Sequence, residues 1–417
     1  MEARPIARLL VASCLFLRAS AAAAAPLDSL IPNLFGGSLS TSITPFIQAG
    51  EQQPDVQRPR VAERFRGLSA SLATAASQAP VPSASGAFQF QWDPELDTFV
   101  RRDQSLGSLL AERAQTLGRG TITVSGSYTH IHFSTLDGDS LDSVRSVQPA
   151  LTEDFLAQLP VEDRLRAQDN TLETTLNLNF SLDLFFFAAA YGITDNIDVS
   201  LALAVNRAHM RGRAEAVIRD PNGDGGAFFI QSQQGVVPGE AGNPECSFFT
   251  CARDSFDQTA FGTGDLYLRA KWHIGDTKWA DFATAGVLTL PTGNADNFLG
   301  FHDPTFTPWL IASKDFGRVS PHVNLGYSFR SGKDVSQARW IAGADVLAAR
   351  WLTVGGDFLG FHDDKRDGIN DDVIQAAIEL KLNPFGQTVI GGSLQFPVNR
   401  DGIRADVIYT LQIESTF

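Results

Sequence analysis

Residues 173–191 begin with a strict alternation of polar and apolar side chains that runs to Leu184. Every even position from Leu176 to Phe186 is leucine or phenylalanine, and every odd position from Glu173 to Asp183 is polar. This period of two predicts a β-strand whose two faces differ in polarity. The run exceeds the roughly 9–11 residues that a tilted strand needs to cross a bilayer. We therefore predict a transmembrane strand with its apolar face in lipid and its polar face in a lumen.

The same alternation recurs through the rest of the chain, and this repetition strengthens a signal that is weak in any single strand. Twelve strands are predicted near residues 120–133, 172–190, 196–209, 263–274, 280–291, 305–315, 319–330, 338–348, 350–361, 371–382, 387–397 and 403–417.

The connections between these strands alternate in length. Short turns follow strands two, four, six, eight and ten, whereas the other connections are mostly longer and include residues 134–171 and 210–262. Bacterial outer-membrane barrels have an even strand number, short periplasmic turns and longer outer loops. The fold prediction is therefore all-β: a transmembrane antiparallel β-barrel of about twelve strands over residues 120–417, with both termini in the periplasm. A hairpin at residues 88–100 would make fourteen.

The N-terminus resembles a secretory signal peptide, predicted over residues 1–24. Arg4 and Arg8 precede an apolar run, and the chain becomes alanine-rich from Ala19 onward. Such a signal on a barrel predicts the outer membrane of a Gram-negative bacterium. Residues 25–119 form a separate extension in which residues 61–76 and 105–117 have helical spacing. This extension is predicted to be either periplasmic or a plug in the lumen, and a partial plug is favoured.

Charge limits the partners and the chemistry. The formal net charge of −14 argues against nucleic acid, because phosphate binding requires clustered lysine and arginine. The expected partners are outer-membrane lipid, lipopolysaccharide and the barrel assembly machinery. His130 and His132 lie near Ser127 and Ser134, but no G-x-S-x-G motif presents a serine as a nucleophile. We predict no catalytic residues and no enzyme activity.

Charged residues on the predicted inner face are the candidate lumen lining. They can form a mixed-charge constriction that selects solutes, or they can pair across neighbouring strands and close the interior. These residues are Asp183, Asp198, Asp265, Arg269, Lys271, His322, Arg330, Glu379, Lys381, Arg404, Asp406 and Glu414.

Two aromatic residues break the polar pattern of the first strand described. Phe185 and Phe187 fall on its predicted inner face. They can form a patch for a hydrophobic ligand or, as favoured, pack against the N-terminal plug. Tyr128, Trp272 and other aromatics on predicted outer faces are expected in the belts at the bilayer interfaces.

Two features of the predicted outer loops suggest local sites. Asp220, Asn222 and Asp224 have the spacing of the first half of a calcium-binding loop, but the twelfth position is Gln231 rather than glutamate. An ordinary turn is therefore the favoured alternative to calcium, and no other cofactor is expected. Cys246 and Cys251 are predicted to form a disulfide, because the compartment is oxidising.

Several segments resemble one family of bacterial outer-membrane proteins. They are YGITDNIDVSLAL (191–203), GTGDLYLRAKWHI (262–274), LTLPTG (288–293), PHVNLGYSF (321–329) and SLGSLLAERAQTLGRG (105–120). That family is assigned to the meta-pathway of phenol degradation and is distantly similar to the long-chain fatty-acid transporters. The resemblance covers roughly residues 100–417, although Ser415 departs from the usual terminal pattern.

This resemblance implies passive uptake of hydrophobic or aromatic small molecules through an outer-membrane channel. It implies no catalytic residues. A barrel without a transport role, or an outer-membrane hydrolase, is the alternative.

Overall fold

The computed structural model describes residues 25–34, 42–45, 60–77, 90–93, 98–101, 105–149, 153–158, 161–219, 221, 228–231, 251–331, 335–364 and 372–417. Within these ranges, twelve antiparallel strands form a closed barrel, because the first of them, β4, pairs with both β7 and β18. The barrel strands are β4 (Ile122–Leu136), β7 (Thr171–Thr194), β8 (Ile197–Arg219), β10 (Cys251–Asp276), β11 (Asp281–Leu290), β12 (Thr305–Ser313), β13 (Val319–Ser328), β14 (Gln337–Ala349), β15 (Leu352–Asp363), β16 (Asp372–Phe385), β17 (Thr388–Pro397) and β18 (Ile403–Thr416).

The remaining elements are not strands of this ring. Two short strands, β5 (Asp139–Ser140) and β6 (Val144–Pro149), extend the sheet beside β4 and β7. Two small sheets pair β1 (Ser42–Pro45) with β9 (Phe228–Gln231) and β2 (Phe90–Asp93) with β3 (Thr98–Arg101). The helices are α1 (Leu27–Asn33), α2 (Arg60–Ser77), α3 (Glu153–Gln158) and α4 (Val161–Ala167), with short 3-10 turns η2 (Leu141–Ser143) and η3 (Ala295–Asn297).

The predicted twelve-strand barrel is confirmed. The hairpin predicted at residues 88–100 forms as β2 and β3, but it is a sheet of its own, so the barrel does not reach fourteen strands. The short turns after β7, β10, β12, β14 and β16 lie at one end of the barrel, as predicted. The helix predicted over residues 61–76 is present as α2.

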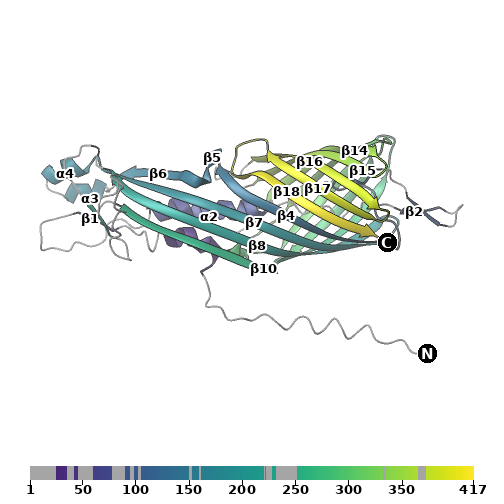
Figure 1. Ribbon diagram of the computed structural model, residues 1–417, viewed down its shortest axis with the longest axis horizontal. Helices are drawn as coiled ribbons and strands as arrows, with labels where there is room; N and C mark the ends of the chain where they lie inside the picture. Colours follow the sequence, from purple (N-terminus) through teal and green to yellow (C-terminus); the bar gives the residue numbers. More distant parts are fainter. Residues whose placement is uncertain are drawn as a thin grey trace, which may run out of the picture.

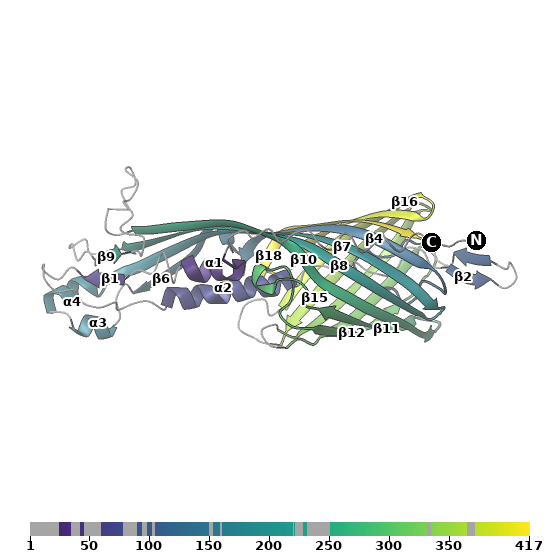
Figure 2. The same ribbon diagram turned by 90° about the horizontal axis from the view of Figure 1, so that it is seen from below.

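Three strands are much longer than predicted. Strands β7, β8 and β10 contain 24, 23 and 26 residues and continue past the barrel rim as a curved sheet (Figures 1 and 2). At about 3.3 Å per residue, β10 is roughly 85 Å long, well beyond the hydrocarbon core of about 30 Å. The expectation that residues 134–171 and 210–262 are simply loops is therefore wrong for the parts that form β6 and the extended strand ends.

Helices α1 and α2 lie along the inner side of this sheet extension (Figure 2). Leu30 and Ile31 of α1 and Leu72 of α2 are buried against one apolar cluster that includes Phe180 of β7 and Met210 of β8. Each fully buried leucine or isoleucine contributes about 1.5–3 kcal/mol, so this cluster holds the helices to the sheet.

That packing reverses the predicted orientation of β7. Its even residues, including Leu182 and Phe186, are buried on the inner side, whereas Phe187 and Tyr191 are exposed on the outer side. The prediction that the even face of this strand meets lipid is wrong. Alternation fixes which residues share a face, but the helices supply an apolar partner inside the molecule, and the periodicity does not reveal them.

The outer surface of the barrel carries an apolar belt. Leu201 and Leu203 of β8, Leu268 of β10 and Ile378 of β16 are all exposed there. On β8 the outward residues change from apolar at Ile197–Val205 to charged or polar between Arg207 and Glu215. The belt therefore ends where the sheet extension begins. The part of the barrel between the short turns and the sheet extension is the part that meets the membrane.

Leu201 gives a direct test of this boundary. Leu201→Arg should destabilise the folded barrel by about 2–4 kcal/mol, because it places a charge in the lipid-facing belt. Urea-dependent folding into phospholipid vesicles measures the change. Thr175→Arg, on the outward face of β7 beyond the belt and paired with Glu215, should leave stability nearly unchanged. Equal effects of the two variants would contradict the proposed boundary.

Candidate functional site

Residues 105–117 cross the interior of the barrel, and we refer to them as the plug. All but Glu112 are buried, and the segment forms bends rather than the helix predicted from its spacing. That helix prediction is wrong for a physical reason. A helix would bond its own amide groups, whereas here side chains of the barrel wall accept several of them.

Glu379 and Lys381 of β16 hold the first half of the plug. The carboxylate of Glu379 accepts the backbone N–H groups of Leu109 at 2.6 Å and Leu110 at 3.1 Å. The ammonium of Lys381 donates to the carbonyl of Ser108 at 3.0 Å. Both charged side chains are almost fully buried, so the plug backbone replaces the water that they would otherwise bind.

Glu112 anchors the second half of the plug. Its carboxylate accepts from Arg269 of β10 at 2.5 Å, and Asp198 of β8 lies 3.6 Å from the same guanidinium. Lys271 is 3.8 Å from Glu112 and 3.7 Å from Asp198. The backbone of Glu112 is also bonded in both directions by the amide side chain of Asn324, at 2.7 and 2.9 Å. Opposite charges are therefore paired between the plug and the wall.

His322 forms a polar network with Asp357 and Asp345 at the same end of the lumen. His322 Nε2 lies 2.6 Å from Asp357 Oδ1, and Asp357 Oδ2 accepts from Ser108 of the plug at 2.9 Å. Asp345 lies 3.7 Å from His322 Nδ1 and 3.9 Å from Arg113 of the plug. All of these groups lie near the short-turn end of the barrel, which is the periplasmic end in outer-membrane barrels.

Where the plug leaves the lumen, its backbone passes very close to the backbone of Gly192 in β7. Gly118 and Gly120 have positive φ values of 91° and 79°, and they turn the chain from the lumen into β4. The amide of Gly120 donates to the carbonyl of Gly192 in β7 at 2.8 Å. A Cβ atom on Gly192 would lie 1.8 Å from the carbonyl oxygen of Gly118. Only glycine fits at this crossing.

Gly192→Ala should therefore disrupt the junction between plug and wall. Overpacking of this kind costs about 1–3 kcal/mol or more, because backbone must move to relieve the contact. The heat-induced gel shift of the refolded barrel should show a reduced folded fraction. Gly275→Ala is the control, because a Cβ there has nothing within 4 Å. A normal folded fraction for Gly192→Ala would show that the junction is not constrained as described.

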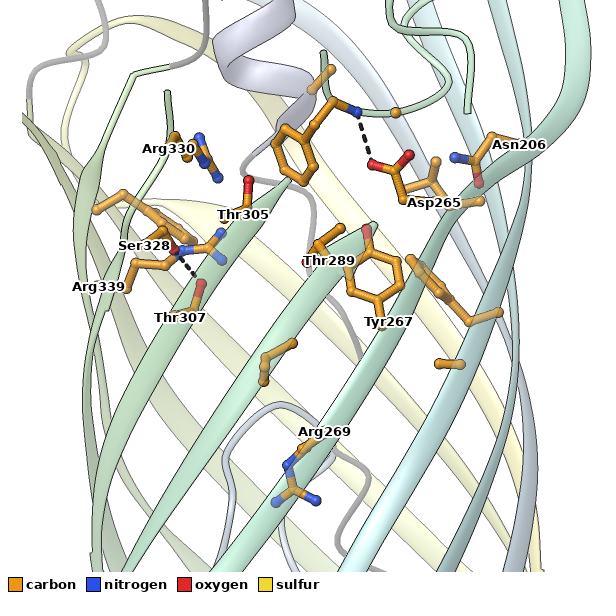
Figure 3. Close-up of a pocket in the computed structure, with 18 of the residues that line it drawn as sticks. Asn206, Asp265, Tyr267, Arg269, Thr289, Thr305, Thr307, Ser328, Arg330 and Arg339 are labelled. Carbon is orange, nitrogen blue, oxygen red and sulfur yellow. Dashed lines mark hydrogen bonds between the residues drawn. The ribbon is translucent and has the colours of Figure 1, made fainter. Parts of the chain in front are cut away.

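A cavity of about 230 Å³ lies between the plug and helix α2. Its lining is largely apolar and aromatic on one side, including Leu184, Phe186, Tyr267 and Phe298. The opposite wall carries Arg330 and Arg339 beside the hydroxyl groups of Thr305, Thr307 and Ser328 (Figure 3). Arg269 points away from them toward the plug (Figure 3).

The lumen-lining candidates divide into two groups. Ten lie on the inward face: Asp198, Asp265, Arg269, Lys271, His322, Arg330, Glu379, Lys381, Arg404 and Glu414. Of these, the plug contacts Asp198, Arg269, Lys271, Glu379 and Lys381.

Asp183 and Asp406 lie on the outward face, contrary to the prediction. Asp183 accepts from Tyr128 at 2.8 Å and pairs with His130 and Arg207, above the apolar belt. It follows the reversed orientation of β7. Asp406 accepts from Ser134 at 2.7 Å, because irregularities in the β18–β4 pairing shift its register.

Phe185 and Phe187 also face outward, so the predicted ligand patch and the favoured packing on the plug are both wrong. The apolar cavity wall is instead formed by their neighbours Leu184 and Phe186. Sequence reasoning assigned these two residues to lipid. The unusual length of the alternating run was the signal that the strand does more than cross a bilayer.

The local sites of the outer loops are not placed. Asp220, Asn222, Asp224 and Cys246 lie outside the described residues, so the calcium and disulfide predictions remain predictions. Within the described ranges, no group of three or more His, Cys, Asp or Glu side chains is arranged to hold a metal ion.

The closed strand ring and its apolar outer belt define an outer-membrane β-barrel, since a closed barrel leaves no unpaired strand edge in lipid. No helix among the described residues has the length and hydropathy needed to cross a membrane.

Neither a protein-family model nor a curated protein matches the chain. Solved structures are similar to it at low identity. An outer-membrane channel from Pseudomonas putida F1 matches with 13% identity and a TM-score of 0.39, over 73% of this chain and 98% of that one. A FadL homologue from Pseudomonas aeruginosa matches with 9% identity and a TM-score of 0.34, over 73% and 91%. The toluene transporter TbuX from Ralstonia pickettii matches with 10% identity and a TM-score of 0.33, over 72% and 90%.

Proposed function

We propose that this protein is an outer-membrane channel for the passive uptake of hydrophobic or aromatic small molecules. The observation that carries the proposal is the cavity inside the lumen, where Leu184, Phe186 and Phe298 line an apolar wall between α2 and the plug. Ligand sites are typically concave, mostly apolar and supplied with a few polar groups. A barrel with only a structural role has no need for an apolar cavity in its interior.

The plug is the proposed gate. It closes the short-turn end of the lumen beside the cavity. Its attachment to the wall includes hydrogen bonds and ion pairs that water can replace one at a time, together with packing of Leu109 and Leu110. A molecule that enters from the outer side would collect in the cavity and pass when the plug moves. The proposed setting includes lipopolysaccharide around the outer rim and insertion by the barrel assembly machinery. A place in phenol degradation rests on the sequence resemblance alone.

Two adjacent alanines provide the test. Ala188 lines the cavity, whereas Ala189 is exposed on the lipid-facing side of the same strand. Production of the wild-type protein in Gram-negative cells should raise the initial uptake rate of labelled benzyl alcohol. Ala188→Trp, which fills the cavity, should abolish this increase, and Ala189→Trp should retain it. An uptake rate that does not respond to the wild-type protein would exclude the proposed function.

A further inference from the structure

Among the described residues, the lining of the cavity carries more arginines than carboxylates. Among the cavity-lining residues, Arg269, Arg330 and Arg339 face two carboxylates, Glu112 and Asp265. Arg269 is paired with Glu112 at 2.5 Å, so these two charges compensate each other beside the plug. Arg330 and Arg339 lie together at the other end of the cavity (Figure 3).

Asp265 is already engaged by backbone. Its Oδ1 accepts the N–H of Gly293 at 3.0 Å and its Oδ2 accepts the N–H of Phe301 at 2.8 Å. These bonds hold the loop that carries η3 over the cavity. In Figure 3 Asp265 stands across the cavity from Arg339, so it does not serve as the counterion of that guanidinium.

Arg339 stacks on an aromatic ring. Its guanidinium carbon lies 4.8 Å from the centre of the Phe361 ring. Within the described part of the chain, its Nε atom is buried without a hydrogen-bond partner, and the Thr305 hydroxyl on the same wall is likewise unbonded. Asp363, the inward carboxylate two residues beyond Phe361, is close enough for its charge to act on Arg339, and it also accepts from Gln337 at 2.5 Å. A guanidinium nitrogen and a hydroxyl that are buried without hydrogen-bond partners favour an anionic ligand, because unsatisfied buried polar groups are costly.

Arg330 adds a second cation on the same wall. Its guanidinium stacks over Phe301 at 4.6 Å and donates to the carbonyl of Val335 at 3.3 Å. Two neighbouring guanidinium groups repel each other unless an anion lies between or beside them, and the planar guanidinium fork matches a carboxylate in a bidentate geometry. The hydroxyl pair of Thr307 and Ser328, 2.9 Å apart, lines the adjoining wall.

We infer that the cavity binds a small aromatic carboxylate, with its carboxylate on Arg339 and its ring against the apolar wall. This inference rests on the proposed function and narrows its substrate class from hydrophobic or aromatic small molecules to single-ring aromatic acids. The volume of about 230 Å³ suits one substituted ring rather than a long chain. Phe186 and Tyr267, whose ring centres are 5.9 Å apart, supply an aromatic surface for that ring.

Benzoate and benzyl alcohol separate charge recognition from apolar recognition, because both carry one ring and differ mainly in the charged group. Isothermal titration calorimetry on the purified, detergent-solubilised full-length protein should show benzoate binding at least about tenfold more tightly than benzyl alcohol, the ratio expected for a charge-assisted hydrogen bond. Arg339→Gln should weaken benzoate binding by about tenfold or more and leave benzyl alcohol binding within about twofold. Arg207→Gln, which removes an outward-facing arginine, should change neither affinity.

The outcomes distinguish this inference from the function on which it rests. If benzyl alcohol binds and benzoate is not preferred, or if Arg339→Gln binds benzoate like the wild type, the carboxylate assignment is wrong while an apolar channel stands. An equal loss in Arg207→Gln would also overturn it, because the effect would then not come from the cavity. If the folded wild-type protein binds neither compound, both the carboxylate site and the proposed ligand cavity fall.

Discussion

Replacing residues 105–117 with a flexible Gly/Ser linker of equal length is expected to convert a closed protein into an open channel. The wild type should give no resolvable current steps in planar bilayers, because the plug fills the short-turn end of the lumen. Without the plug, charged wall residues such as Asp198, Lys271 and Glu379 would be solvated by water in a continuous pore. The barrel itself should persist, since its closure depends on strand pairing and not on the plug. Steady single-channel current should therefore appear.

Deletion of residues 26–100 is the matched control. It removes α1, β1, α2, β2 and all of β3 except Arg101, but retains every plug residue that bonds the wall. This variant should stay closed to ions. If the linker variant is also silent although its gel shift shows a folded barrel, the lumen is closed by something other than the plug. If the wild type conducts freely, the plug does not seal the pore at all.

The second large effect is expected at Glu379. Glu379→Ala should release the first half of the plug, because the amides of Leu109 and Leu110 lose their shared acceptor and Lys381 loses a neighbouring opposite charge. The amide of Leu110 keeps the Ser108 hydroxyl as an acceptor at 3.0 Å, so the main loss is at the amide of Leu109. An unsatisfied buried group costs about 1–3 kcal/mol, and plug docking should weaken by roughly that amount. Amide hydrogen exchange should show a large loss of protection at residues 106–112, since local opening governs the exchange of such segments.

Two control variants test whether the loss of protection comes from the Glu379 carboxylate. Glu379→Gln keeps one acceptor oxygen and should give an intermediate loss of protection at the same amides. Asp183→Asn removes an outward carboxylate that bonds Tyr128 and Arg207, and it should leave plug exchange unchanged. Full protection of Leu109 and Leu110 in Glu379→Ala would mean that the plug is held chiefly by packing of its leucines.

Alternation in the sequence was sufficient to predict where most strands run and which way their side chains face. On β10, Trp272 was predicted to face outward and Arg269 and Lys271 inward, and the structure has them so. The signal is reliable there because membrane on one side and a polar interior on the other impose opposite requirements on successive residues. The even strand number and the clustering of short turns at one end follow from the same pattern.

On β7 the same kind of pattern gave the wrong orientation. Leu182, Leu184 and Phe186 form a more regular apolar series than any on β10, yet they face inward. Their partners are α1, α2 and the cavity, which belong to distant parts of the chain. A period of two is symmetric between the faces of a strand, so only the location of the apolar partner decides which face is inside.

The sequence by itself determined the barrel class, the strand number and most inward charges, because bilayer thickness and the pleat of a strand act on each segment locally. Only the tertiary structure decided that residues 105–117 cross the lumen as a bent plug. Their amides are bonded by Thr353, Glu379 and other wall side chains separated from them by hundreds of residues. The cavity arises for the same reason: it lies among strands, the plug and α2, and no single segment encodes it.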